Sequence, residues 1–284
     1  VDPLRAVESL RLQQGPIDVV LRAWGEPEEV ERAHAQARAR FATLLSELVA
    51  ELPRLREPVG RTYPLFAGAV ARRMAAAVWP HRAVFITPMA AVAGAVAEEL
   101  LQALLRGRTL AKAFVNDGGD IALHLSPGQS LRAGIVNDLL HPGIDATTEI
   151  VFDDPVRGIA TSGWRGRSQS LGIADAVTVL APSAAQADAA ATLIANAVNV
   201  DHPAIERRPA RTLKEDSDLG DLPVTVAVPP LPAGSIRQAL QNGLATARAM
   251  QQGRLILAAY LALQGQVETL ALPVECGALR SQSR

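Results

Sequence analysis

Two oxygen-bearing side chains, Asp188 and Thr192, lie four positions apart in the alanine-rich stretch QADAAATLIANAV (186–198). The stretch is predicted to be helical, and residues at positions i and i+4 lie on one face of an α-helix. A carboxylate and a hydroxyl placed in this way are hard oxygen donors, which Mg²⁺ prefers and usually shares with phosphates. Because D-x-x-x-T also occurs by chance, a solvated pair is the alternative. In either case Asp188 is expected to be an exposed carboxylate that adds little to stability.

A glycine pair flanked by polar residues interrupts the apolar segment FVNDGGDIAL (114–123). The motif consists of Asn116, Asp117, Gly118, Gly119 and Asp120. As a structural feature it predicts a tight hairpin, because Asn, Asp and Gly tolerate positive φ. As a functional feature it predicts a loop whose missing side chains let a ligand contact the backbone. The aspartates would then suit a metal ion or a ribose hydroxyl.

Small hydroxyl residues, glycines and two arginines follow a predicted strand in GIATSGWRGRSQS (158–170). The candidate residues are Thr161, Ser162, Gly163, Arg165 and Arg167. Backbone N–H groups, hydroxyls and guanidinium groups are the donors that bind phosphate oxygens. The segment is therefore predicted either to bind a phosphorylated ligand or to form a solvated loop.

The hydrophobic pattern that must position these residues predicts an α+β fold. Strands that follow one another directly, with helices inserted in groups, favour antiparallel sheets with packed helices. The expected strands are 15–25, 84–87, two within 112–125, 131–137, 147–152, 158–163, 175–182, 222–228, and a hairpin within 255–272 that turns at Gln264 and Gly265. The expected helices are 26–55, 65–79, 88–107, 184–198 and 235–253, with a polar loop at 201–222.

Composition excludes several classes of function. The net charge of −1 argues against a nucleic-acid binder, and a single cysteine, Cys276, excludes an internal disulfide framework and fits a reducing compartment. The most apolar region (74–105) is interrupted by His81, Arg82, Glu98 and Glu99, so no membrane span is expected. The start of the sequence lacks the basic segment and apolar core of a signal peptide, and the expected location is cytoplasmic.

The order of the motifs resembles that of the ApbE-like family, the FAD:protein FMN transferases. That family shows G-x-x-K-G-x-x-x-D on a helix, V-N-x-G-G-D after a strand, T-S-G after a strand, and A-D-A-x-x-T on a helix. The corresponding segments here are AAVAGAVAE (90–98), VNDGGDI (115–121), ATSG (160–163) and ADAAAT (187–192). Gly94 and Glu98 are in register in the first motif, but Ala93 stands where the family has lysine.

The resemblance implies a single ApbE-like chain over 1–284, built of two tandem T-fold-like halves with a boundary near 108–160. It implies that Asp188 and Thr192 bind Mg²⁺ close to the loop 116–120. The residues that it implies for FAD binding are Asn116, Asp117, Gly118, Gly119, Thr161, Ser162, Gly163, Arg165 and Arg167. The implied partners are a flavin nucleotide and an acceptor flavoprotein, whose Thr or Ser hydroxyl receives FMN from FAD.

One departure from the family concerns the base that accepts the proton of the acceptor hydroxyl. After T-S-G the family carries a segment of the type His-Ile-x-Asp-Pro, whose histidine is the expected base. This chain has SQSLGIADAV (168–177) there, and its histidines lie elsewhere, at positions 34, 81, 124, 141 and 202. Asp175 or Asp120 is then the candidate base. A flavin-nucleotide binding protein without transferase chemistry, and an assembly factor for a redox enzyme that docks through helix 27–51, remain alternatives.

Overall fold

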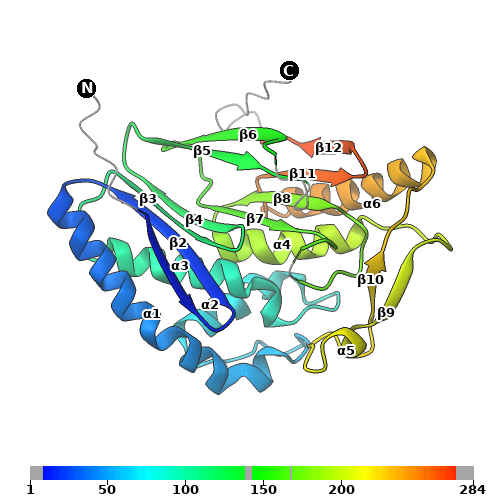
Figure 1. The fold of residues 1–284 in the computed structure, drawn as a ribbon, viewed down its shortest axis with the longest axis horizontal. Coiled ribbons are helices and arrows are strands. Elements are labelled where there is room, and N and C mark those ends of the chain that lie inside the picture. The colour runs from blue at the N-terminus through cyan, green and yellow to red at the C-terminus, as the bar shows by residue number, and fades with distance from the viewer. Residues whose placement is uncertain (1–8, 138–142, 167, 273–284) are drawn as a thin grey trace. The chain divides into compact units, whose positions relative to one another are not determined.

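A computed structural model describes residues 9–137, 143–166 and 168–272, and the chain divides into two compact units (Figure 1). Unit 1 consists of Val1–Leu131, Ile150–Ala160 and Ala181–Asp188, and unit 2 consists of Arg132–Glu149, Thr161–Leu180 and Ala189–Arg284. The boundaries fall within strands β5 (Ser130–Ile135), β6 (Ala146–Val151), β7 (Gly158–Ser162) and β8 (Ala176–Ala181) and within helix α4 (Ala184–Ala197), so each of these elements contributes residues to both units. Arg167, His141 and Cys276 lie outside the described residues.

Unit 1 is built on antiparallel strands. These are β1 (Leu10–Gln14), β2 (Ile17–Trp24), β3 (Lys112–Asp117) and β4 (Asp120–Leu125), paired in that order, and Ile121 of β4 pairs with Ile159 of β7. Strand β2 buries every second residue, which is the period of a strand with one face on the core. The hairpin β3–β4 therefore lies between β2 and β7, with its polar turn at the end of the strands.

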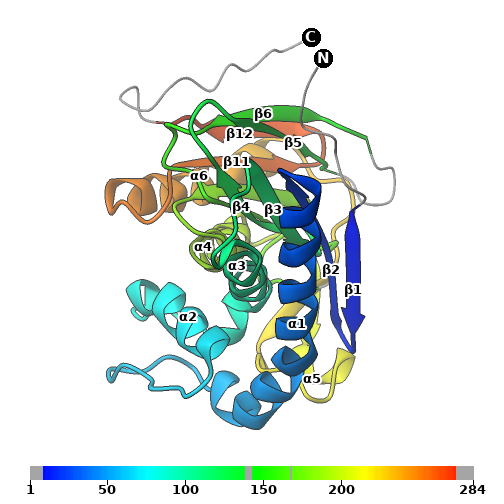
Figure 2. The same cartoon turned by 90° about the vertical axis from the view of Figure 1, so that its left-hand side faces the viewer.

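The helices of unit 1 are α1 (Pro27–Leu55), α2 (Ala69–Val78) and α3 (Val92–Leu105), with short 3₁₀ turns η1 (Trp79–His81) and η2 (Pro88–Ala91). Proline at the start of α1 and acidic residues in its first turn favour initiation of that helix. Helix α3 packs against α1, α2, β3 and β4, and in Figure 2 it is seen nearly end-on beside α1. The apolar face of α1 is buried inside unit 1.

The segment Pro88–Leu105 is long and apolar enough to cross a membrane by length and composition alone. In the structure 61% of this segment is buried, because it packs on the strands and helices of unit 1. It is the core helix of a folded unit.

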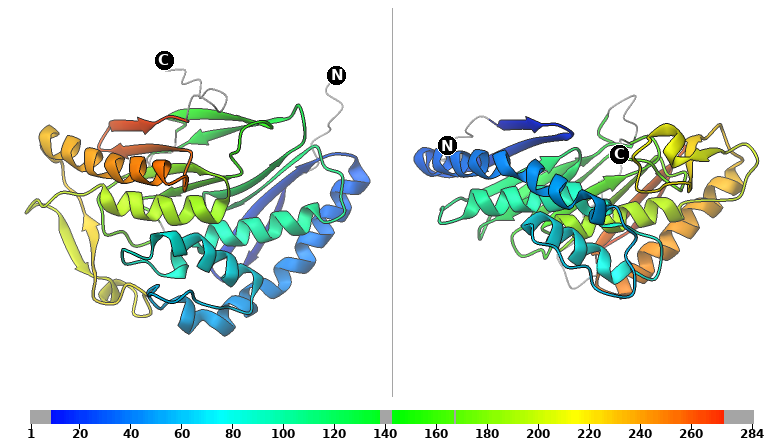
Figure 3. Two further views of the ribbon diagram at one scale, coloured as in Figure 1. Left: turned by 180° about the vertical axis from the view of Figure 1, so that it is seen from behind. Right: turned by 90° about the horizontal axis from the view of Figure 1, so that it is seen from below.

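Unit 2 contains antiparallel strand pairs and one long helix. Most residues of β5, β6 and β8 belong to it. The elements that lie wholly within it are β9 (Glu206–Pro209), α5 (Ala210–Leu213), β10 (Pro223–Ala227), α6 (Ala233–Gln252), β11 (Ala258–Leu263) and β12 (Gln266–Leu270). Strand β11 pairs with both β8 and β12, and α6 covers β11 and β12 (Figure 3). The β11–β12 turn has positive φ at Gln264 and Gly265, as a tight hairpin requires.

The predicted α+β fold with antiparallel sheets is confirmed, because each pair of strands with a defined register is antiparallel. The T-fold-like relation of the two halves stays a prediction.

Three expectations about single elements are wrong. Residues 84–87 form no strand: Ile86 accepts one backbone hydrogen bond from Val59, and Val84 and Phe85 are exposed. Strand β1 was not expected, since its residues are mostly polar and it is held by pairing with β2 rather than by burial. The polar loop 201–222 contains β9 and α5, which form where the chain pairs with β10.

Candidate functional site

The glycine pair forms the tight turn of the β3–β4 hairpin, as the structural interpretation predicted. Gly118 and Gly119 have φ of 65° and 116°, values that residues with a Cβ rarely adopt. The N–H of Gly119 donates to Oδ1 of Asn116 over 2.8 Å, so Asn116 stabilises the turn. Asp117 pairs across the hairpin with Asp120, and only 6% of the Asp117 surface is exposed. Strand β3 thus ends, next to the turn, at the nearly buried carboxylate of Asp117.

Asp188 lies in the first half of helix α4 and is partly buried, which corrects the expectation of an exposed carboxylate. Its Oδ2 accepts a hydrogen bond of 3.0 Å from the backbone N–H of Gly94. Gly94 lies in the first turn of α3, where N–H groups have no partner within the helix. Asp188 therefore caps helix α3 from a neighbouring helix.

Electrostatics around Asp188 favour its protonated form in the absence of a cation. Burial raises the pKa of the Asp188 carboxyl, the N–H of Gly94 opposes this rise, the negative charge of Asp117 adds to it, and the net value is about 7. Two carboxylates thus lie close enough to interact unfavourably, and a divalent cation bound between oxygen donors would relieve this cost.

The glycine and the glutamate of the motif AAVAGAVAE (90–98) both lie where helix α3 crosses the start of α4. A Cβ at Gly94 would overlap the carbonyl group of Ala184 and lie 2.8 Å from the Ala185 nitrogen. Glycine therefore lets the two helix starts approach at backbone distance. Oε1 of Glu98 accepts a hydrogen bond of 2.7 Å from the N–H of Ala185. The sequence pointed to Gly94 and Glu98 through the family resemblance, but not to these contacts.

Thr192 lies four residues after Asp188 on the same helix, so the helical register expected from the sequence is present. The Thr192 side chain is partly exposed. Among the described residues, no group of three or more His, Cys, Asp or Glu side chains forms a metal cluster. The side chains predicted to bind the metal, Asp188 and Thr192, carry only oxygen donors, which are of the type that Mg²⁺ prefers.

In unit 2 the T-S-G segment is held by a network around Asp175. Oδ1 of Asp175 lies 3.3 Å from the indole nitrogen of Trp164 and 3.2 Å from Nε of Arg165, and Oδ2 accepts a hydrogen bond from the N–H of Gln264. Gly163 passes so close to the Asp175 backbone that a Cβ would overlap its carbonyl oxygen. Nothing in the sequence pattern indicated Trp164 or Gln264 as partners of Asp175.

These three donors fix the orientation of the Asp175 side chain. Elsewhere in the segment the hydroxyls of Thr161 and Thr178 lie 2.9 Å apart, so Thr161 is tied to strand β8. The guanidinium of Arg165 stacks on Trp164, 5.0 Å from the ring centroid.

The segment 168–177, where the family has its histidine, is attached to the end of helix α4. Asn196 accepts hydrogen bonds from the N–H of Leu171 and the hydroxyl of Ser170, and Ile173 donates to the carbonyl of Val198. This anchoring uses backbone and amide groups and needs no imidazole.

Among the described histidines, three have a pKa that burial lowers. These are His34, His81 and His124. All three belong to unit 1, and none of them belongs to one of the four motifs. The fourth described histidine, His202, belongs to unit 2 and also lies outside the motifs. No described histidine therefore occupies the sequence position of the family's base.

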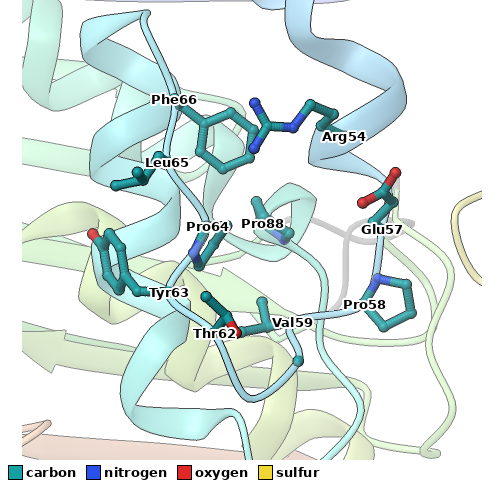
Figure 4. A pocket seen from close by; sticks show the side chains of 11 residues that line it. Arg54, Glu57, Pro58, Val59, Thr62, Tyr63, Pro64, Leu65, Phe66 and Pro88 are labelled. Carbon is teal, nitrogen blue, oxygen red and sulfur yellow. The ribbon is translucent and has the colours of Figure 1, made fainter.

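A pocket of about 360 Å³ lies in unit 1, after the end of α1 (Figure 4). Its lining is mostly apolar and includes Tyr63, Leu65, Phe66 and Pro88, and the guanidinium of Arg54 lies over the Phe66 ring. The residues predicted for metal or flavin binding do not line this pocket.

The raised pKa of Asp188 predicts how stability depends on pH in the metal-free protein. The unfolded chain releases this proton near the ordinary value of 3.8, whereas the folded protein holds it up to about 7. Between these values the folded state binds more protons, so this group's contribution to the free energy of unfolding falls as pH rises. Urea unfolding at about pH 5 and pH 8 should show wild type losing stability relative to Asp188→Asn. An equal pH response of the two proteins would contradict the assignment.

Comparison with known proteins identifies the family of this chain. A family model described as "AbpE bacteria" matches residues 2–269. UPF0280 proteins of Methanothermobacter thermautotrophicus, Methanosarcina acetivorans and Methanopyrus kandleri are 40%, 31% and 39% identical over 123, 213 and 159 residues. These matches cover 40%, 72% and 55% of this chain, and 43%, 78% and 60% of the relatives, so two of the three span less than two thirds of the relative.

Two solved structures share the fold at low sequence identity. The apo crystal structure of the flavinyl transferase ApbE from Pseudomonas stutzeri has a TM-score of 0.54 at 14% identity, with 94% of each chain covered. The flavin transferase ApbE from Vibrio cholerae has a TM-score of 0.50 at 13% identity, with 94% of this chain and 97% of that chain covered. With a family model matched over nearly its whole length, the chain is a member of the ApbE-like family described as "AbpE bacteria".

Proposed function

We propose that this protein is a Mg²⁺-dependent flavin transferase, which moves FMN from FAD to a Thr or Ser hydroxyl of an acceptor protein. The observation that carries the proposal is the Asp117–Asp188 pair, two neighbouring carboxylates beside the glycine turn, in a chain of the ApbE-like family. Because a single cysteine fits a reducing compartment, we place this activity in the cytoplasm.

In this proposal Asp188, Thr192 and Asp117 supply oxygen donors for Mg²⁺. When bound, the cation would act as a Lewis acid on the diphosphate of FAD. The turn Asn116–Asp120 brings backbone close to the nucleotide, because its glycines have no side chain. The segment Thr161–Gly163 offers hydroxyl and N–H donors for phosphate oxygens, and Arg165 and Arg167 add positive charge.

The proposed reaction exchanges one phosphorus–oxygen bond for another. The acceptor hydroxyl oxygen bonds to the phosphorus of the FMN half, the bond to the AMP phosphate breaks, and AMP leaves. The hydroxyl proton passes to a carboxylate base. The candidate bases are Asp120 and Asp175, and the Asp175 side chain is oriented by donors from Trp164, Arg165 and Gln264.

A second candidate function is flavin-nucleotide binding without transfer. The segment 168–177 supports it, since it carries no histidine and is fastened to α4 by backbone and amide hydrogen bonds. Incubation of the protein with FAD and Mg²⁺, followed by assay of AMP, separates the two candidates. Release of AMP that requires Mg²⁺ supports the transferase, and tight binding of FAD without AMP supports the binding protein. Absence of both contradicts the proposal.

Arg165 provides a prediction about phosphate recognition. Its guanidinium is oriented by Asp175 and by the Trp164 ring, so a lysine would lose the planar, directed geometry. Charge-assisted hydrogen bonds contribute roughly 1.5–3 kcal/mol, and Arg165→Lys is therefore expected to weaken FAD binding by about tenfold or more. Fluorescence titration of FAD measures this effect, with Arg248→Lys on α6 as control. Wild-type affinity in Arg165→Lys would remove Arg165 from the site.

A further inference from the structure

We propose that Glu98 is a positioning residue for Asp188: helices α3 and α4 cap each other's N-termini through these two carboxylates, and this reciprocal capping fixes where the Asp188 carboxylate lies. The part of the inference that concerns metal binding rests on the proposed function. The reciprocal capping itself is a property of the metal-free protein.

Helix α3 receives its cap from α4. The residue before α3, Ala91, makes no side-chain capping hydrogen bond. The first-turn N–H of Gly94 instead donates to Oδ2 of Asp188 over 3.0 Å. A carboxylate at this place also interacts favourably with the positive end of the helix dipole.

Helix α4 receives its cap from α3 in the same manner. The first-turn N–H of Ala185 donates to Oε1 of Glu98 over 2.7 Å. The side chain of Ser183, which precedes α4, provides only a longer hydrogen bond: its Oγ accepts from the N–H of Gln186 over 3.4 Å. The stronger cap of α4 is thus supplied by another helix.

The two caps share one crossing point. Glu98 follows Gly94 by four residues, and Asp188 follows Ala184 by four, so each carboxylate lies one turn beyond the residue at the crossing. Gly94 lacks the Cβ that would overlap the Ala184 carbonyl, and this close approach lets each carboxylate reach the other helix. Loss of one cap therefore loosens the crossing that the other cap needs.

Glu98 is itself held in place from α2. Oε2 of Glu98 lies 3.5 Å from a guanidinium nitrogen of Arg73, and Arg73 also contacts the neighbouring Glu99. Glu99 in turn binds Arg40 of α1 over 2.8 Å. Glu98 and Glu99 are thus adjacent carboxylates in one network, but Glu98 is the one that caps α4. This difference provides a matched control.

The first test measures amide hydrogen exchange in the metal-free protein by NMR. In Glu98→Met the exchange of the Gly94 amide is expected to accelerate about fivefold, although Glu98 does not bond to Gly94, because a lost cap costs about 1 kcal/mol. Glu98→Gln keeps an oxygen acceptor for Ala185 and should restore most of the protection. Conversely, Asp188→Ala should accelerate exchange of the Ala185 amide. Glu99→Gln should lower the melting temperature without changing either amide selectively.

The second test measures the Mg²⁺ concentration that half-saturates FAD binding. Glu98→Met is expected to raise this Mg²⁺ concentration about fivefold. Glu98→Gln should raise it much less, and Glu99→Gln should leave it unchanged. If wild type binds no FAD with Mg²⁺, the proposed function fails, while the exchange experiment still decides the capping.

Three outcomes overturn the inference. In the first, Gly94 exchange in Glu98→Met stays within twofold of wild type. In the second, Glu99→Gln accelerates Gly94 exchange as much as Glu98→Met does. If Glu98→Met does not fold, the exchange rate of the Ala185 amide in Asp188→Ala tests the reciprocal capping instead. The third contrary outcome is an Ala185 exchange rate that equals that of wild type.

Discussion

Replacing Asp188 with asparagine is expected to weaken Mg²⁺-dependent FAD binding by at least about 100-fold, with the protein still folded. Asparagine keeps an oxygen that accepts the hydrogen bond from the N–H of Gly94, so the cap on α3 survives. It removes the negative charge with which Asp188 would bind a cation. In the metal-free protein burial and the charge of Asp117 both disfavour that negative charge. Calorimetric titration of FAD in the presence of Mg²⁺ measures the loss of affinity.

The control is Asp153→Asn, which makes the same chemical change at an exposed aspartate. It should bind FAD and Mg²⁺ as wild type does. Unchanged FAD affinity in Asp188→Asn with Mg²⁺ present would show that Asp188 is a capping residue and not a metal ligand. Unfolding of Asp188→Asn would show that its charge, rather than its oxygen, stabilises the crossing of the two helices.

The second large effect is expected at Gly94, where alanine should destabilise the protein by roughly 3 kcal/mol. In the interior of an ordinary helix the same change stabilises by about 1 kcal/mol, since alanine has the higher helix propensity. Here the added Cβ would overlap the backbone of Ala184, which cannot move aside as a flexible side chain does. The two helix starts would have to separate, and both capping hydrogen bonds would lengthen.

Urea unfolding tests this expectation, with Gly234→Ala in helix α6 as the matched control. Gly234 is also helical, but a Cβ there meets no atom within 4 Å. Its replacement should leave stability unchanged or raise it by about 0.5 kcal/mol. If Gly94→Ala proves as stable as Gly234→Ala, the close crossing of α3 and α4 is not what holds Asp188 in place.

Features with a local cause were predictable from the sequence. The β3–β4 turn follows from Asn116, Gly118 and Gly119, whose backbone preferences specify a hairpin without help from the rest of the chain. Helix α1 follows from its periodic apolar residues and its acidic first turn. The register of Asp188 and Thr192 follows in the same way, because it depends only on the helix between them.

Features that depend on distant partners were not predictable. Strand β1 exists through its pairing with β2, and its own sequence has little strand character. Residues 84–87 have strand propensity but lack a neighbouring strand with which to pair. The partner of Asp188, Gly94, is more than ninety positions away, so its burial and its raised pKa could not be inferred from the helical pattern. The donors that orient Asp175 likewise come from Trp164 and Gln264, on either side of it in the chain.

The most direct measurement of the central claim is a calorimetric titration of FAD into the wild-type protein, with and without Mg²⁺, at a pH above the Asp188 pKa of about 7. If Asp188, Asp117 and Thr192 hold the cation that binds the diphosphate, FAD should bind at one site with Mg²⁺ and at least about tenfold more weakly with EDTA. Below that pKa the effect of Mg²⁺ should diminish, because protons compete with the cation for Asp188. FAD binding that is equally tight with EDTA, or absent in both conditions, would contradict the claim.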